Sequence, residues 1–253
     1  MEYNEYKRIY DSLNRPEDIE RLLKKGYDER LLETLFTQKT SREVKKKFHV
    51  VKQKAPDMLR EWKRGRTIME ISDKYRFPPI LTAMFIFLED GASRKQFWEF
   101  IRSPDLLESR QTADEVRDVV RNDFVYSPHA NDRQKERGVW GETLLQDWLD
   151  GQGIKYRTEE DLRGEGTKTP DCLLDEPMLY DGKKICWIES KASFGDNVEF
   201  RFNSRKQLCP YTTLFGPGLV VYWTGCLNDM ECPEGVYISD ISVLEKKLKR
   251  VGE

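Results

Sequence analysis

Histidine, cysteine pairs and long apolar runs are scarce in this chain of 253 residues, and each shortage removes a class of protein. Only His49 and His129 are present, so acid–base or metal chemistry must depend mainly on carboxylates and lysines. The five cysteines form no CxxC pair, which argues against a disulfide framework or a structural zinc site and fits a reducing cytosol. The longest apolar run, at 80–88, is too short to span a membrane.

The chain also lacks a signal peptide and a large charge of one sign. Residues 1–5 are too polar for a signal peptide, which predicts a cytoplasmic location, or a nuclear one in a eukaryotic source. Positive and negative side chains nearly cancel at a net charge of -2, while aromatic residues make up 11%. This balance argues against global disorder and favours one large domain or two small ones.

Charge is nevertheless unevenly distributed along the chain. Residues 1–125 carry 26 Lys and Arg against 23 Asp and Glu, and residues 39–66 alone hold 11 basic and 3 acidic side chains. A solvated helix face would show the same pattern, but two basic runs beside helix-turn-helix patterns favour a polyanion partner. The predicted nucleic-acid contacts in this basic stretch are Lys45, Lys46, Lys47, Lys63, Arg64 and Arg66.

The first half is predicted to be α-helical, with two helix-turn-helix-like units. One pair of helices is separated by Gly26. The second pair begins at the N-cap Thr67, turns at 75–78 and continues from Pro79 as an apolar helix. Ordinary helical bundles contain the same connection, so groove binding is one of two interpretations, and no recognition helix is distinctive enough to predict base contacts.

A polar segment at 126–137 separates this half from one rich in strand patterns. We therefore expect an α-helical, nucleic-acid-binding domain at 1–126 and an α/β domain at 127–253. In the second domain the pattern predicts, in chain order, an amphipathic helix at 139–149, strands at 154–156, 171–180, 184–192 and 219–223, and a final helix at 242–251.

Acidic residues and one lysine form the most distinctive constellation. Asp171 opens one strand of the expected hairpin, and Glu189 and Lys191 end the other on one face, because strand side chains alternate. A carboxylate and an ammonium at the end of an apolar face are costly to bury unless they coordinate or pair. A two-residue turn at 181–182 would put Asp171 on the opposite face, so we expect a three-residue loop or one bulge.

With that register, Asp171 and Glu189 would lie close enough to hold one divalent cation, Mg²⁺ or Mn²⁺. Such an ion lowers the pKa of a bound water and neutralises charge on a phosphodiester. Lys191 would orient the attacking water or stabilise the transition state. Glu142, on the amphipathic helix, would complete the metal shell or bind a second ion, although each residue alone is also an ordinary surface charge.

Three strings resemble a known nuclease family: KTPD at 168–171, WIESKASFGD at 187–196 and FGPGLV at 215–220. Together they resemble the TPD branch of the PD-(D/E)xK nuclease superfamily, which contains archaeal proteins and the eukaryotic codanin-interacting nuclease. The resemblance covers roughly residues 138–240. The short motif alone is common by chance, whereas the three strings in order are specific.

The resemblance implies an archaeal, divalent-metal-dependent nuclease with a restriction-endonuclease-like α/β core, a central mixed sheet flanked by helices. The implied catalytic residues are Asp171, Glu189, Lys191, Glu142 and Gln207, with Asp171, Glu189 and Glu142 as metal ligands. Tyr211, one helical turn after Gln207, would contact the substrate, although Pro210 interrupts a regular helix there. The implied substrate is structured or branched DNA, favoured over RNA.

Other classes of function stay open on the sequence alone. The core would also suit a non-catalytic nucleic-acid-binding scaffold, although a retired site has no physical reason to keep buried charges together. A protein-interaction module and a transcription factor using the helix pairs are further interpretations. A homodimer would supply two sites for cutting both strands of a duplex.

Overall fold

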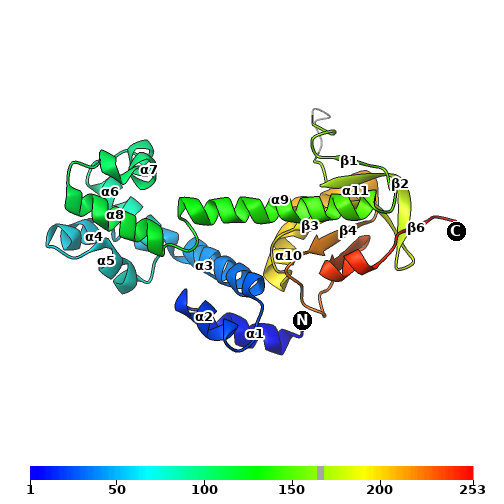
Figure 1. Ribbon diagram of the computed structural model, residues 1–253, viewed down its shortest axis with the longest axis horizontal. Helices are drawn as coiled ribbons and strands as arrows, with labels where there is room; N and C mark the ends of the chain where they lie inside the picture. Colours follow the sequence, from blue (N-terminus) through cyan, green and yellow to red (C-terminus); the bar gives the residue numbers. More distant parts are fainter. Residues whose placement is uncertain (164–167, 253) are drawn as a thin grey trace. The chain divides into compact units, whose positions relative to one another are not determined.

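A computed structural model describes residues 1–163 and 168–252, which form two compact units (Figure 1). We call residues 37–135 the helical unit, and residues 1–36 with 136–253 the sheet unit. The boundaries fall inside the long helices α3 (Glu29–Lys52) and α9 (Pro128–Asp150). This division differs from the boundary expected at 126, because the first 36 residues group with the sheet. No helix of the described residues is long and apolar enough to cross a membrane.

The helical unit consists of short helices packed around one central helix. Between α3 and α9 its segments are α4 (Ala55–Lys63), α5 (Ile68–Tyr75), α6 (Pro79–Glu89), α7 (Arg94–Arg102), the 3₁₀ turn η1 (Pro104–Leu106) and α8 (Arg110–Asn122). Every residue of α6 from Ile80 to Phe87 is buried, and α6 packs against α4, α5, α7 and α8. The core of this unit therefore surrounds α6.

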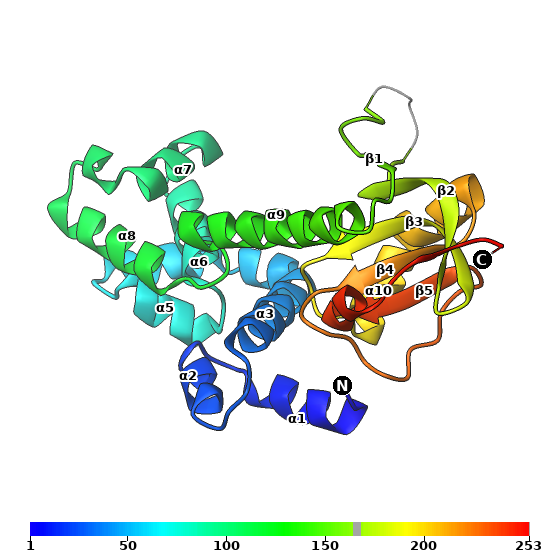
Figure 2. The same cartoon turned by 45° about the vertical axis from the view of Figure 1, so that its right-hand side comes forward.

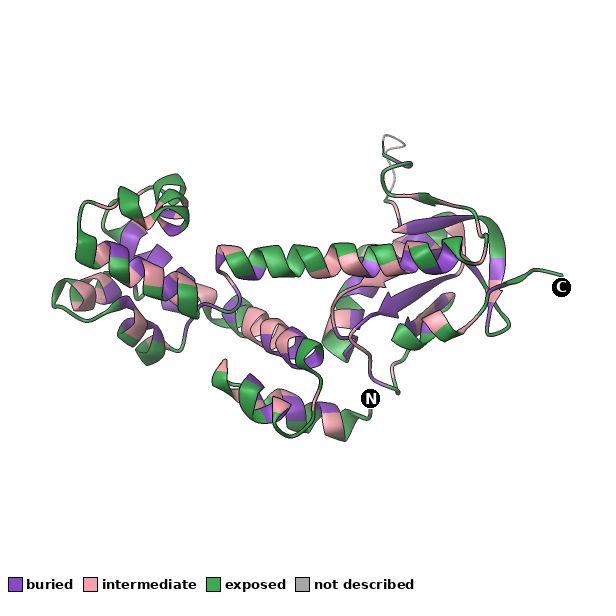
Figure 3. Cartoon of the chain, viewed as in Figure 1, coloured by how far each residue is buried: buried purple, intermediate pink, exposed green. Residues whose placement is uncertain are grey.

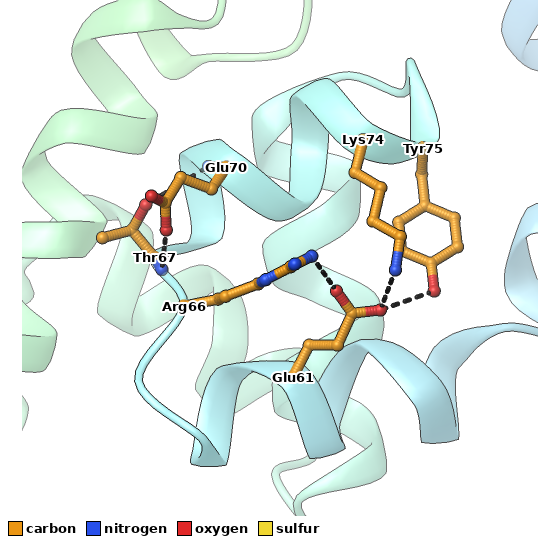
Figure 4. Close-up of polar contacts among 6 residues, drawn as sticks. All are labelled: Glu61, Arg66, Thr67, Glu70, Lys74 and Tyr75. Atoms are coloured by element: carbon orange, nitrogen blue, oxygen red, sulfur yellow. Dashed lines mark hydrogen bonds and ion pairs between the residues drawn. The ribbon is translucent and has the colours of Figure 1, made fainter.

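The pair α5–α6 has the expected helix-turn-helix order, and local contacts fix its start. Thr67 and Glu70 form a capping box in which each side chain accepts the other residue's backbone N–H (Figure 4). Arg76 ends α5 in the left-handed region, at φ +47°. The second helix is the buried α6, whose residues 80–87 offer no exposed face to a nucleic-acid groove. Its burial fits the bundle interpretation of this pattern.

The sheet unit is built around a mixed sheet with the order β1-β2-β3-β4-β5, in which β1 to β3 are antiparallel and β3 to β5 parallel. Its strands are β1 (Tyr156–Thr158), β2 (Cys172–Tyr180), β3 (Lys183–Lys191), β4 (Gly218–Tyr222), β5 (Val236–Asp240) and β6 (Lys249–Arg250). Its other segments are α1 (Tyr3–Ser12), α2 (Glu17–Leu23), α10 (Asn197–Asn203), the π-helical turn η2 (Ser204–Leu208), α11 (Cys209–Phe215) and the 3₁₀ turn η3 (Ile241–Glu245).

The end of the chain departs from the sequence prediction. The helix expected at 242–251 is wrong: the structure has the short turn η3 followed by strand β6. Lys249 of β6 pairs with Leu179 at the part of β2 that β1 does not cover. Pairing with this open strand edge satisfies backbone groups that a short terminal helix would leave to water.

Helices cover both faces of the sheet, which Figure 2 shows from the side of α9. On one face Leu149 of α9 packs in a cluster with Ile188 and Leu219. On the other face Tyr211 of α11 packs with Trp187 and Val220. The strands are accordingly mostly buried, as the purple ribbons of Figure 3 indicate. The expected α/β class with a mixed sheet flanked by helices is confirmed.

Contacts of α1 explain why the first residues belong to the sheet unit. Tyr6 donates a hydrogen bond of 2.7 Å to Oδ2 of Asp196, and its ring stacks on Phe194 with centroids 5.4 Å apart. The other oxygen of Asp196 caps α10 by accepting the backbone N–H groups of Val198 and Glu199. α1 thus holds the loop between β3 and α10 through partners about 190 positions away.

Tyr6→Phe is expected to lower the free energy of unfolding by about 1–2 kcal/mol, because it leaves a buried carboxylate oxygen without its hydroxyl donor. Tyr3→Phe, on the same helix but 52% exposed, is the matched control and should change stability by less than about 0.5 kcal/mol. Urea unfolding of both variants measures the difference. Equal stabilities for the two variants would contradict this role of Tyr6.

Candidate active site

The hairpin of β2 and β3 brings Asp171 and Glu189 together by an irregular register. The turn contains two residues, Asp181 and Gly182, with positive φ of 48° and 75°. Tyr180 therefore pairs with Lys183, but the register shifts farther along, where Leu173 pairs with Trp187. The expected three-residue loop is wrong. The alternative, one bulge, is right in placing an irregularity within the strands, but the register shifts by three positions between Met178 and Leu173 and not by one.

This shift places Asp171 opposite Glu189. In the shifted register Cys172 pairs with Ile188, so the next position along the strand is Asp171 opposite Glu189. The irregularity also affects β3 itself: Ile185 belongs to the cluster under α9, whereas Trp187 belongs to the cluster under α11. Simple alternation would have placed these two side chains on one face.

Asp171, Glu189 and Lys191 form a connected group. The backbone N–H of Asp171 donates to Oε2 of Glu189 at 3.2 Å, and Oδ2 of Asp171 accepts the N–H of Ser190 at 2.7 Å. Lys191 donates from Nζ to Oε1 of Glu189 at 2.5 Å. The Glu189 side chain is 2% exposed and that of Lys191 19%, so the group lies at the boundary between core and surface.

Burial makes this group electrostatically costly. Desolvation, followed by the charge of Asp171, raises the pKa of Glu189 to about 7, although Lys191 acts in the opposite direction. Desolvation also raises the pKa of Asp171. Two carboxyl groups therefore share the single positive charge of Lys191. When both are ionised, one negative charge is left that a second cation could compensate.

Glu142 reaches the same region from α9. It lies on an exposed side of this helix, yet partial desolvation and then the charge of Asp171 raise its pKa, while Lys191 lowers it. The preceding residue, Gly141, permits the close approach of α9 to β3, because a Cβ there would lie 3.0 Å from Oγ of Ser190. The three predicted acids and the lysine are thus brought within electrostatic range of one another.

Gln207 and Tyr211 act on the backbone beside Asp171. The Tyr211 hydroxyl donates to the carbonyl oxygen of Thr169 at 2.7 Å, and the Gln207 side chain hydrogen-bonds the same hydroxyl. Tyr211 is buried, and its ring meets Trp187 edge-on at 5.4 Å. The expected interruption at Pro210 is accommodated by the π-helical turn η2, after which α11 begins at Cys209.

Sequence reasoning missed Glu159, which follows strand β1. Its negative charge raises the pKa of Glu142, Asp171 and Tyr211, so it belongs to the same acidic region. An exposed Glu159-Glu160 pair after a short strand carries no signal that distinguishes it from an ordinary turn.

The residue types fit a hard divalent cation. Asp171 and Glu189 supply carboxylate oxygens, and their raised pKa values indicate a site that a positive charge would stabilise. Across residues 1–163 and 168–252, no three His, Cys, Asp or Glu side chains come together as a metal-binding group. An ion held by two carboxylates would take its other ligands from water or a phosphate, as Mg²⁺ commonly does.

The six predicted nucleic-acid contacts in the basic stretch are all exposed and lie in the helical unit. Ion pairs neutralise the charge of some of them. Figure 4 shows Arg66 and Lys74 on the carboxylate of Glu61, at 2.6 Å each. Lys63 pairs with Asp90 at 2.6 Å. Among the described residues, neither Lys46 nor Arg64 forms an ion pair. Lys45, Lys46 and Lys47 lie in α3, while Lys63 ends α4 and Arg64 and Arg66 follow it.

Comparisons with known proteins give the family. Residues 108–242 match the family described as protein of unknown function TPD sequence-motif, and the chain belongs to this family. Proteins named CDAN1-interacting nuclease 1 are similar to it: that of Xenopus laevis is 32% identical over 183 residues, 68% of this chain and 60% of the relative. The Homo sapiens relative is 32% identical over 173 residues, 65% and 62% of the two chains. The match thus spans about three fifths of these relatives' length. No solved structure matches.

The raised pKa of Glu189 predicts that stability falls as pH rises. The folded state holds this proton up to pH about 7, whereas the unfolded chain releases it near 4.5, so the stabilisation is complete below 4.5 and is lost by about 7. Without metal, Glu189→Gln should remove most of this decline between pH 5 and 8, as measured by urea unfolding.

Glu176→Gln is the control for this prediction, because Glu176 is an exposed residue of β2. It should keep the decline seen in the unmodified protein. An identical pH dependence in the two variants would show that Glu189 is not the group responsible.

Proposed function

We propose that the chain is a divalent-metal-dependent nuclease of the PD-(D/E)xK type that hydrolyses phosphodiester bonds, with structured or branched DNA as substrate. The observation that carries the proposal is the buried carboxylate of Glu189, which accepts hydrogen bonds from the backbone of half-buried Asp171 and from Lys191. A purely structural group would gain little from two desolvated carboxyl groups and one lysine. The word nuclease in the names of the relatives supports the same activity.

In this mechanism Asp171 and Glu189, with Glu142 beside them, would hold Mg²⁺ or Mn²⁺. The ion, when bound, supplies a nucleophilic water at neutral pH and neutralises charge on the phosphate. Lys191 orients the attacking water and stabilises the negative charge that develops on the phosphoryl oxygens. Its contact with Glu189 positions the ammonium at the edge of the buried group.

Tyr211 and Gln207 have a positioning role in this proposal. Because the Tyr211 hydroxyl binds the carbonyl of Thr169, it fixes the backbone that leads to Asp171. Gln207 in turn holds that hydroxyl from η2. The sequence predicts that Tyr211 contacts the substrate, whereas its buried ring and bonded hydroxyl favour support of the metal-binding loop.

Binding of the nucleic acid is assigned to the helical unit and its basic stretch. The residues Lys46 and Arg64 are the strongest candidates, since they are exposed and form no ion pair among the described residues. The names of the relatives state an interaction with CDAN1, which favours a protein partner as a second candidate function for this chain. A homodimer, an archaeal source and a cytoplasmic or nuclear location remain predictions of the sequence.

Lys191→Ala is expected to lower the cleavage rate at least about 100-fold, because it removes the charge that stabilises the transition state. Cleavage of labelled single-stranded, duplex, flap and four-way DNA, and of RNA, is measured with Mg²⁺, Mn²⁺ or EDTA. Lys184→Ala, on the exposed end of the same strand, is the matched control and should cut normally. Cutting that persists in EDTA or in Lys191→Ala would exclude this mechanism.

Metal binding itself gives a readout that does not depend on activity. Mg²⁺ or Mn²⁺ should raise the melting temperature of the unmodified protein, because an ion that binds only the folded state stabilises it. The same ion should leave the melting temperature of Glu189→Gln unchanged. Equal shifts in both proteins would place metal binding elsewhere.

The basic stretch predicts steep salt dependence of duplex DNA binding, measured in EDTA so that no cutting occurs. Lys46→Ala with Arg64→Ala should reduce the slope of log affinity against log salt by about 2, close to 0.9 for each lost phosphate contact. Lys63→Ala with Arg66→Ala removes the same charge from residues already paired to Asp90 and Glu61, and should have less effect. Affinity that barely changes with salt would show that this stretch is not the binding surface.

A further inference from the structure

The helical unit contains a cavity of about 610 Å³ between α7, α8 and the start of α9. Four arginines line it: Arg102, Arg117, Arg121 and Arg133. None of them belongs to the basic stretch. The remaining lining is largely apolar and includes Ile101, Val120 and Phe124. A concave surface that combines guanidinium groups with apolar side chains suits a ligand with one anionic and one flat apolar part.

The one acidic residue of the lining does not offset these charges at the cavity surface. Asp123 is 3% exposed, and its carboxylate accepts the backbone N–H groups of Ile80, Val125 and Tyr126 at 2.9, 2.9 and 2.7 Å. Its oxygens therefore link the start of α6 to the segment between α8 and α9. The cavity also includes Pro128, where α9 begins, and the positive end of a helix dipole favours an anion.

The arginines differ in how firmly they are already held. Arg117 is anchored by ion pairs with Asp105 and Asp114. Arg121 makes one long contact, 3.4 Å to Asp118, and Arg102 has no ion-pair partner within the described part of the chain. Arg102 and Arg121 are both exposed, so their guanidinium groups are available to an incoming anion.

Phe124 supplies the flat apolar surface. Its side chain is 40% exposed, and the guanidinium of Arg133 lies over its ring at 5.8 Å from the centroid. An exposed aromatic ring beside arginines is the arrangement on which nucleic-acid bases stack in single-strand-binding proteins. Bases of a duplex are stacked on one another, so only an unpaired base could reach this ring.

We propose that this cavity binds one unpaired nucleotide of a nucleic-acid strand, with its phosphate on Arg102 and Arg121 and its base against Phe124. The inference rests on the proposed function, because a nuclease must hold a nucleic acid. It goes further by assigning recognition of single-stranded segments, such as those of branched DNA, to a site separate from the basic stretch. It requires no contribution from the catalytic residues.

The test measures binding of a labelled single-stranded oligodeoxynucleotide by the full chain in EDTA. Arg102→Ala with Arg121→Ala should weaken binding about 10-fold and reduce the salt slope by about 1.4, at 0.7 for each phosphate contact to a single strand. Phe124→Ala should weaken it about 5-fold or more through lost stacking. Arg94→Ala with Arg110→Ala is the matched control, since both are exposed residues of α7 and α8 outside the cavity.

Control variants that bind as the unmodified protein, together with both losses above, support the proposal. Equal losses in the cavity and control pairs, or no loss in the cavity pair, would overturn it. Competition separates the sources of the ligand: dAMP that displaces the strand at equal concentration of nucleotide would mean a site for free nucleotides. If a poly-glutamate peptide displaces the strand and Phe124→Ala binds the strand as the unmodified protein does, the cavity is a general anion-binding or protein-docking surface. That result would overturn the proposal.

Failure of this inference is distinguishable from failure of the proposed function. Metal-dependent cutting that stops in Lys191→Ala, combined with unchanged binding by Arg102→Ala with Arg121→Ala, rejects the cavity alone. If the cavity variants weaken binding as expected but the unmodified protein shows no metal-dependent cutting, only the nuclease proposal is rejected. Melting temperatures of all variants confirm folding, and the arginine pair remains decisive if Phe124→Ala proves unstable.

Discussion

The desolvation of two carboxyl groups, one buried and one half-buried, beside a single lysine is the constraint on which the rest of the sheet unit depends. Asp171 and Glu189 are brought together by backbone hydrogen bonds to their oxygens and by Lys191, yet burial raises the pKa of both. Such a group lowers stability at neutral pH, and a cation bound there would offset part of this cost. The fold therefore has to hold the hairpin rigidly from outside, because the group itself favours opening or protonation.

Two tryptophans and three glycines provide that support. Trp187 donates from Nε1 to the carbonyl of Gly216, and a Cβ at Gly218 would lie 2.1 Å from its ring. Trp223 donates to Oγ of Ser190, and a Cβ at Gly141 would lie 2.5 Å from the Trp223 ring. The strings WIESK and FGPG are thus coupled by packing, since the tryptophan of one occupies the space that the glycine of the other leaves open. Their joint occurrence has a physical cause besides ancestry.

The sequence predicted the α/β class and the meeting of Asp171, Glu189 and Lys191, because strand alternation and turn chemistry are local properties. The sequence did not decide between a longer turn and a bulge in the β2–β3 hairpin. The irregularity within these strands depends on their pairing with β1, β4 and β6, which lie far from the turn in the sequence or the sheet. The grouping of residues 1–36 with the sheet was beyond it, because it depends on contacts such as that of Tyr6 with Asp196. The burial of α6 follows from four neighbouring helices, and a pattern of apolar residues alone also fits a recognition helix.

The two units differ in net charge. The helical unit carries 21 Lys and Arg against 15 Asp and Glu, a net of +6, whereas the sheet unit carries 22 against 30, a net of -8. A polyanion is therefore attracted by the helical unit and repelled by the unit that holds Asp171 and Glu189. A cation between Asp171 and Glu189 would remove part of that repulsion at the point where the phosphate must approach. In the proposed function, a metal ion would then be needed for cutting and not for binding, because the helical unit would attract the nucleic acid through its own arginines and lysines.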